Sequence, residues 1–180
     1  RLLGRQVLLE ADLLGDVPLH EVVGGAAVRL HLVQRGADEL HRDVRFITGN
    51  DKPLGMMQGV DLAGVGAVFY TGYHAKAGTP AAPLAHTWTG WINDVRLDGV
   101  STGEFGVNAA VAGHFGVPVA FVAGDDKAVA QTRALLGERV VGVETKQGIS
   151  TFTALHLHPT RAQELIRAGA EEAVRRAGEL

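Results

Sequence analysis

His74 and His86 stand at the two ends of a loop whose other residues offer little chemistry. The segment from 70 to 87 reads YTGYHAKAGTPAAPLAHT and contains the end of the apolar run VGAVFY. A neutral imidazole can bind a divalent metal ion through one ring nitrogen while a backbone carbonyl fixes the other nitrogen. An imidazole also titrates near neutral pH, which suits it to proton transfer. His74 is therefore a candidate metal ligand and His86 a candidate catalytic residue, although either can equally be a loop residue that only hydrogen-bonds to the backbone.

Glu104 is the candidate acidic partner of the two histidines, and it has a competing structural role. Ser101 and Glu104 have the spacing of a capping box, in which each side chain would bond to the other's backbone at the start of a helix. Alternatively, the Glu104 carboxylate projects toward His74, because a hairpin expected around Asp98-Gly99 can return the chain to the strand ends. On the residues alone, both interpretations stand.

The composition limits what kind of site this can be. The chain has 180 residues with eight histidines and no cysteine, so a metal ion would be held by His, Asp or Glu side chains. The net charge of −3 argues against nucleic acid as the main partner. No apolar stretch has the length of a bilayer span and no signal peptide is evident, so we expect no membrane partner and a cytoplasmic location. The common phosphate-binding, dinucleotide-binding and nucleophile-elbow motifs are also missing.

Apolar runs alternate with helical patterns, which predicts a single α/β domain over residues 1–180. Strands are expected at 44–47, 65–70, 119–123 and 140–145, and helices at 101–116, 127–136 and 158–180. The run at 65–70 is nearly all apolar, which is typical of a strand buried on both faces of a parallel sheet. We therefore expect a mixed or mostly parallel sheet flanked by helices, with a small hairpin insertion. Asp125 and Asp126, between a strand and a helix, are expected to be N-caps.

The first 36 residues carry a poorer pattern than the rest of the chain. Gly15, Pro18 and the pair Gly24-Gly25 interrupt every apolar run in this segment. We expect irregular structure here, and an edge of the sheet beside residues 65–70 that is poorly covered.

Several separated motifs resemble those of the zinc-dependent D-aminopeptidase family. They are GYHAKAGT at 72–79, HT at 86–87, GEFGVNAAVAG at 103–113, VPVAFVAGDD at 117–126 and VETKQGIS at 143–150. Their order and spacing agree with the family from about residue 37 to the C-terminus. The resemblance implies that His74 and Glu104 bind zinc (Zn2+) and that His86 is a catalytic residue.

The resemblance also implies an activity and an assembly. It implies a metal-dependent aminopeptidase that releases N-terminal D-amino acids from short peptides, and a homo-oligomeric ring whose sites face an inner channel. Family members carry further ligands in a D-x-E-G strand and in a second strand ending in N-D-x-H. Neither motif is present, and Glu10, Asp12 and His31 are the nearest substitutes. A site made of His74 and Glu104 alone would bind zinc weakly.

Two other functions remain open at this point. The chain can be a catalytically inactive family member that acts as an oligomeric or peptide-binding protein, or a metal hydrolase of another small amide. Zinc stoichiometry separates the first of these from the active peptidase, and a panel of D- and L-aminoacyl substrates separates the second.

Overall fold

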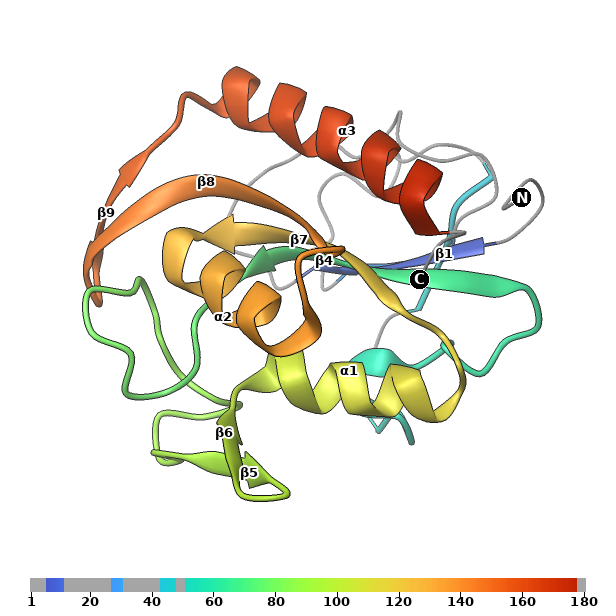
Figure 1. The fold of residues 1–180 in the computed structure, drawn as a ribbon, viewed down its shortest axis with the longest axis horizontal. Coiled ribbons are helices and arrows are strands. Elements are labelled where there is room, and N and C mark those ends of the chain that lie inside the picture. The colour runs from blue at the N-terminus through green and yellow to red at the C-terminus, as the bar shows by residue number, and fades with distance from the viewer. Residues whose placement is uncertain (1–5, 12–26, 31–42, 48–50, 178–180) are drawn as a thin grey trace.

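A sheet of seven strands forms the centre of the protein, in the order β3-β2-β1-β4-β7-β8-β9 (Figure 1). The computed structural model describes residues 6–11, 27–30, 43–47 and 51–177. The strands are β1 (Gln6–Ala11), β2 (Ala27–Leu30), β3 (Arg45–Phe46), β4 (Val65–Tyr73), β7 (Val119–Asp125), β8 (Val141–Ser150) and β9 (Thr153–His156). Neighbouring strands are parallel, except that β9 runs antiparallel to β8. The α/β class and the mostly parallel sheet are confirmed.

The strand order reverses between β1 and β4. From β1 the chain builds outward through β2 and β3, whereas from β4 it builds in the other direction through β7 and β8. Open α/β sheets place their sites beyond the carboxyl ends of the strands at such a reversal, because the connecting loops diverge there. His74 directly follows β4 and so lies at this position.

Helices cover both faces of the sheet, with α3 on one face and α1 and α2 on the other (Figure 1). They are α1 (Glu104–His114), α2 (Asp126–Leu136) and α3 (Pro159–Arg176), and the 3₁₀ turn η2 (Gly55–Met57) lies beside α1. Ile166 of α3 packs in one apolar cluster with Phe69 and Phe121. Tyr70 and Val122, one residue further along the same strands, belong to the opposite cluster. Strands β4 and β7 are therefore buried on both faces, as their apolar runs predict.

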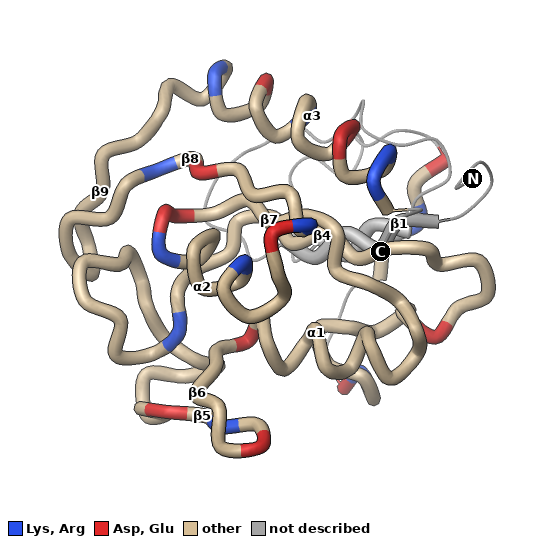
Figure 2. Tube along the Cα trace, in the orientation of Figure 1, with Lys and Arg blue, Asp and Glu red and all other residues tan. Residues whose placement is uncertain are grey.

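Acidic and basic residues follow each other along α3 (Figure 2). Arg161 donates to Glu164 at 3.0 Å, and Arg175 donates to Glu172 at 2.6 Å. Exposed pairs of this kind contribute little to stability, so the apolar face of α3 is what holds it on the sheet. No helix in the described ranges is both long and apolar enough to cross a bilayer.

The predicted hairpin is confirmed, and a second hairpin was not predicted. Strands β5 (Val95–Leu97) and β6 (Val100–Thr102) pair across Asp98 and Gly99, whose φ angles are 48° and 81°. Strand β8, expected to end at 145, continues to Ser150 and turns back into β9. This extension is polar and mostly exposed, so it lacks the apolar alternation by which a strand is recognised in a sequence.

Of the two interpretations of Glu104, the capping box with Ser101 is wrong. Helix α1 begins at Glu104 with Gly103 as its N-cap, and the cap makes no side-chain hydrogen bond. Ser101 instead lies in β6, where its hydroxyl donates to Asp94 and accepts from Lys76. Because the hairpin already uses Ser101, the Glu104 carboxylate is left to face the site described below.

The expectation of an uncovered sheet edge beside residues 65–70 is wrong. The irregular structure expected over the first 36 residues is contradicted at residues 6–11 and 27–30, and the rest of that segment lies outside the described residues. Strand β1 pairs in parallel with β4 from Gln6 to Ala11 and with β2 on its other side. Pairing on both sides stabilises a strand of only six residues, so the glycines and proline further along do not prevent it. Glu10 lies in β1, whereas Asp12 and His31 are outside the described residues.

The N-cap predicted at Asp125 is confirmed, and it leads to a stability prediction. Asp125 Oδ1 accepts hydrogen bonds from the backbone N–H groups of Lys127 at 2.9 Å and Ala128 at 3.1 Å. We expect Asp125→Ala to lower the free energy of unfolding by about 1 kcal/mol in urea denaturation. Asp125→Asn keeps an acceptor oxygen and should retain most of that stability. Equal losses in the two variants would contradict the capping role.

Candidate metal centre

His74 is brought to the site by the end of β4. The pairing of β4 with β7 shifts register between Thr71 and Tyr73, and Gly72 between them has a φ of 72°, a conformation that suits glycine. This irregularity immediately precedes His74. The His74 Nδ1 donates to the backbone carbonyl of Ala75 at 3.0 Å. With the proton on Nδ1, the lone pair of a neutral His74 ring is on Nε2.

His86 reaches the same place from the far end of the loop. Its ring stacks on that of His74, with centroids 3.9 Å apart and an angle of 16° between the planes. The His86 Nδ1 donates to the carbonyl of Leu84 at 2.5 Å, so the lone pair of a neutral His86 ring is also on Nε2. The His86 side chain is 35% exposed against 11% for His74. His86 is thus the imidazole that a molecule from solvent can reach more readily.

Glu104 supplies a carboxylate to both imidazoles. As the first residue of α1 it projects from the helix N-terminus, and its side chain is only 5% exposed. Its Oε1 lies 3.7 Å from His74 Nε2 and 3.9 Å from His86 Nε2. The backbone N–H of Trp88 donates to the same oxygen at 2.6 Å. This hydrogen bond holds Oε1 within 4 Å of the Nε2 atoms of both stacked rings.

The three side chains have the donor chemistry of a zinc site. One ligand atom from each of His74, His86 and Glu104 can be chosen so that all lie within 4.8 Å of one another. Imidazole nitrogen and carboxylate oxygen are both ordinary zinc ligands. Backbone carbonyls hold both imidazoles in the tautomer that presents Nε2, which is the arrangement of metal-binding histidines. The residues present therefore fit a zinc ion.

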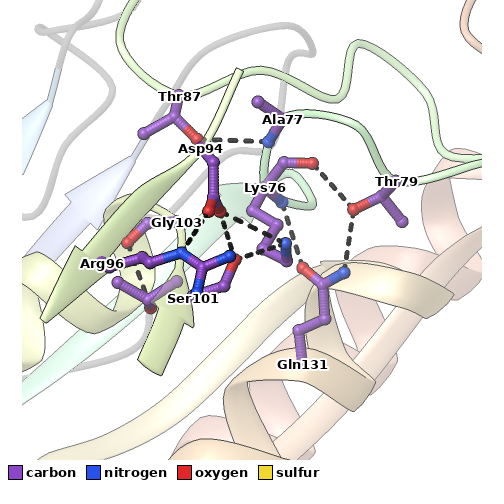
Figure 3. A network of polar contacts seen from close by, with 10 residues as sticks. Lys76, Ala77, Thr79, Thr87, Asp94, Arg96, Ser101, Gly103 and Gln131 are labelled. Atoms are coloured by element: carbon purple, nitrogen blue, oxygen red, sulfur yellow. Dashed lines mark hydrogen bonds and ion pairs between the residues drawn. The ribbon is translucent and has the colours of Figure 1, made fainter. Parts of the chain in front are cut away.

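A polar network anchors the loop between the two histidines (Figure 3). The backbone N–H of Lys76 donates to Gln131 on α2 at 3.0 Å, and Gln131 in turn donates to Thr79 at 2.9 Å. The Lys76 ammonium donates to Ser101 on the β5–β6 hairpin at 2.7 Å. Asp94 belongs to the same network. Hydrogen bonds from Ser101, and to a smaller extent from Arg96, hold the pKa of the Asp94 carboxyl below its ordinary value. The start of the loop is thereby fixed to two separate elements.

The sequence predictions named the three side chains and missed the backbone groups that orient them. The N–H of Trp88 and the carbonyls of Ala75 and Leu84 are backbone atoms that any residue type would supply. No pattern of side chains could have revealed them. Only the polar residues of the loop, such as Thr79, gave a signal that the loop is anchored.

Comparison with known proteins identifies the family. The family model that matches residues 36–180 is Peptidase_M55, described as D-aminopeptidase. The chain belongs to this D-aminopeptidase family. The family resemblance predicted from about residue 37 onward is confirmed.

A curated protein and a solved structure agree with the assignment to the D-aminopeptidase family. The D-aminopeptidase of Bacillus subtilis (strain 168) is 36% identical over 129 residues, which are 72% of this chain and 46% of that protein. The solved structure is that of the Zn-dependent D-aminopeptidase DppA from Bacillus subtilis, a self-compartmentalizing protease. It superposes with a TM-score of 0.73 at 31% identity, over 77% of this chain and 50% of that one. The chain therefore spans about half the length of the relatives it matches.

Proposed function

We propose that this chain is a zinc-dependent aminopeptidase that releases N-terminal D-amino acids from short peptides. The observation that carries the proposal is the convergence of His74, His86 and Glu104, with both Nε2 atoms within 4 Å of one carboxylate oxygen. Family membership supports the same reaction. The zinc dependence of the solved relative supports the choice of metal.

In this proposal His74 and Glu104 hold the metal ion and His86 moves protons. A zinc ion bound there would polarise the scissile carbonyl and lower the pKa of a water molecule. His74 and Glu104 are the two least exposed members of the group, which suits ligands shielded from bulk water. His86 can accept a proton only at Nε2, since Nδ1 donates to Leu84. The Glu104 carboxylate, 3.9 Å away, faces the imidazolium that this step would form.

The assembly belongs to the proposal as well. The solved relative is described as self-compartmentalizing, and we propose a homo-oligomeric ring for this chain. Large apolar side chains that a partner subunit could cover are exposed, among them Trp91 at 91% and Phe152 at 86%. A ring with inward-facing sites would restrict substrates to short peptides.

Metal dependence and stereochemistry test the proposed function together. Because His74 and Glu104 alone bind zinc weakly, the assay supplies zinc in excess. Under these conditions we expect the purified chain to hydrolyse a D-Ala-D-Ala dipeptide, to lose this activity when a chelator removes the metal, and to regain it with added zinc. The L-Ala-L-Ala dipeptide should be hydrolysed far more slowly. Zinc content is measured by elemental analysis and hydrolysis by amino-acid release.

Three other outcomes would contradict the proposal in different ways. A chain without zinc and without turnover would be the inactive family member. Bound zinc without turnover of either dipeptide would indicate that the metal has a structural role. Equal turnover of D- and L-dipeptides would indicate a hydrolase of a broader class of amides.

A further inference from the structure

The loop that carries His86 rests on the β8–β9 hairpin, a contact that the site described above does not include. The backbone N–H of Leu84 donates to the carbonyl of Thr151, in the turn between β8 and β9, at 2.8 Å. The carbonyl of the same residue, Leu84, accepts the hydrogen bond from His86 Nδ1. A single residue thus joins the hairpin to the imidazole.

Gly148 in β8 allows this close approach. A Cβ atom at position 148 would lie 2.1 Å from the carbonyl oxygen of Ala81 and 2.7 Å from Cδ of Pro83. The carbonyl oxygen of Ala81 is a backbone atom, so it cannot rotate away as the end of a long side chain can. Any residue larger than glycine must therefore push the loop away from the hairpin. This displacement would occur at positions five and three residues before His86.

Asp126 at the start of α2 holds Gly148 in place. The carboxylate Oδ1 of Asp126 accepts a hydrogen bond from the backbone N–H of Gly148 at 2.9 Å. Burial by itself raises the pKa of Asp126, but hydrogen bonds from Lys127 and Gly148 outweigh that effect and keep the pKa below its ordinary value. Asp126 is consequently ionised at neutral pH, and its bond to Gly148 is charge-assisted. The pairing of β8 with β9 shifts register just after this point, between Gly148 and Ser150.

The loop backbone depends on contacts of this kind. Ala81 and Leu84 both have φ angles of 50°, in the left-handed region that non-glycine residues rarely adopt. Such conformations persist when the surroundings enforce them. If the hairpin moved away, Leu84 would lose its hydrogen bond to Thr151 and could relax to a common conformation, which would redirect the carbonyl that orients His86.

We propose that Gly148 and Asp126 are positioning residues that fix the orientation and tautomer of His86 through Leu84. Their effect on the orientation and tautomer of His86 does not depend on the role of His86 in catalysis. The consequence for turnover rests on the proposed function, in which His86 is the proton-transfer group.

The direct test is Gly148→Ala, read by long-range ¹H–¹⁵N NMR of the imidazole rings, which distinguishes the Nδ1–H from the Nε2–H tautomer. The His86 signals are assigned as those lost in His86→Ala. In the unmodified protein we expect His86 to be in the Nδ1–H form, and in Gly148→Ala to be a mixture of tautomers. The His74 signals and the zinc content should not change. For D-dipeptide hydrolysis we expect kcat to fall about tenfold to a hundredfold with little change in KM.

Gly142→Ala is the matched control, because Gly142 lies on the same strand but away from the loop. A Cβ atom there would meet Val129 Cγ1 at 2.6 Å and Arg133 Cδ at 3.0 Å, both on α2. This variant reports the cost of an added methyl group on β8 without displacing the His86 loop. His86 should keep its single tautomer in it.

A pair of substitutions at Asp126 gives a second measurement if Gly148→Ala folds poorly. Asp126→Ala removes the acceptor for the Gly148 N–H and should shift the His86 tautomer in the same direction. Asp126→Asn keeps an acceptor oxygen for the Gly148 N–H, so its His86 spectrum should match that of the unmodified protein. A tautomer change in Asp126→Ala but not in Asp126→Asn would show that the lost hydrogen bond, and not the lost charge, is the cause. A His86 spectrum that is unchanged in both Gly148→Ala and Asp126→Ala would overturn the proposal. The spectrum is recorded without substrate, so this test also applies to a chain without activity. An inactive chain would contradict only the proposed function.

Discussion

Replacing His74 with alanine is expected to remove zinc and D-dipeptide hydrolysis together, whereas His86→Ala is expected to keep zinc and lose about a hundredfold or more in turnover. His74 is the more buried ring, and its loss removes a ligand from the metal. His86 is the more exposed ring, and removing a proton-transfer group typically costs about 10²- to 10⁴-fold. Elemental analysis of zinc and steady-state kinetics on the same preparations measure both effects.

His114→Ala is the matched control for these two variants. His114 is in the last turn of α1, where its ring makes an edge contact with Phe115, and it is not a member of the His74–His86–Glu104 group. Its replacement should leave zinc content and turnover unchanged. Equal loss of zinc in His74→Ala and His86→Ala would assign His86 to the metal as a third ligand. The similar distances of the two Nε2 atoms from Glu104 make this the sharpest alternative.

Two substitutions of Glu104 are expected to separate its charge from its structural contact. Glu104→Gln keeps an oxygen that can accept from the Trp88 N–H but removes the negative charge. We expect its zinc affinity to fall by more than the roughly 10- to 100-fold that is typical of residues that only orient a ligand. The stability of the metal-free protein should change little. Calorimetric titration with zinc and urea unfolding after chelation measure the two quantities.

We expect Glu104→Ala to lose as much zinc affinity as Glu104→Gln and also to be less stable than the unmodified chain. It removes the hydrogen bond from the Trp88 N–H to a charged carboxylate, and bonds of this kind typically contribute about 1.5–3 kcal/mol. Zinc affinity in Glu104→Gln equal to that of the unmodified chain would show that Glu104 is a structural carboxylate and not a ligand.

The sequence by itself determined the class of the fold and the residue types that a metal site could use. Fully apolar runs such as 65–70 can be stable only when both faces are covered, so they indicate strands of a parallel sheet whatever their neighbours are. The apolar spacing of the last helix likewise predicts its packing, and Ile166, Ala170 and Ala173 are indeed buried against the sheet. The lack of cysteine restricts a metal site to His, Asp and Glu before any geometry is known.

Features that depend on distant partners were decided only by the tertiary structure. Strand β1 was not predicted because glycines and a proline interrupt the apolar runs of its segment, and it forms because β4 and β2 supply hydrogen bonds on both sides. Local spacing left a cap between Ser101 and Glu104 open as one of two interpretations, but the hairpin engages Ser101 and leaves Glu104 to the histidines.

The orientation of the site's side chains also could not be predicted from the sequence. The tautomers of His74 and His86 are set by backbone carbonyls, and the Glu104 carboxylate is held by the backbone N–H of Trp88. Backbone groups are the same in every residue, so the sequence does not show where they point. The contact of the His86 loop with Gly148 joins segments more than sixty residues apart in the chain, and it exists only because the sheet brings the β8–β9 hairpin beside the loop. Residue types thus determine which chemistry is possible, while contacts between distant backbone segments determine the orientation of the imidazole and carboxylate groups.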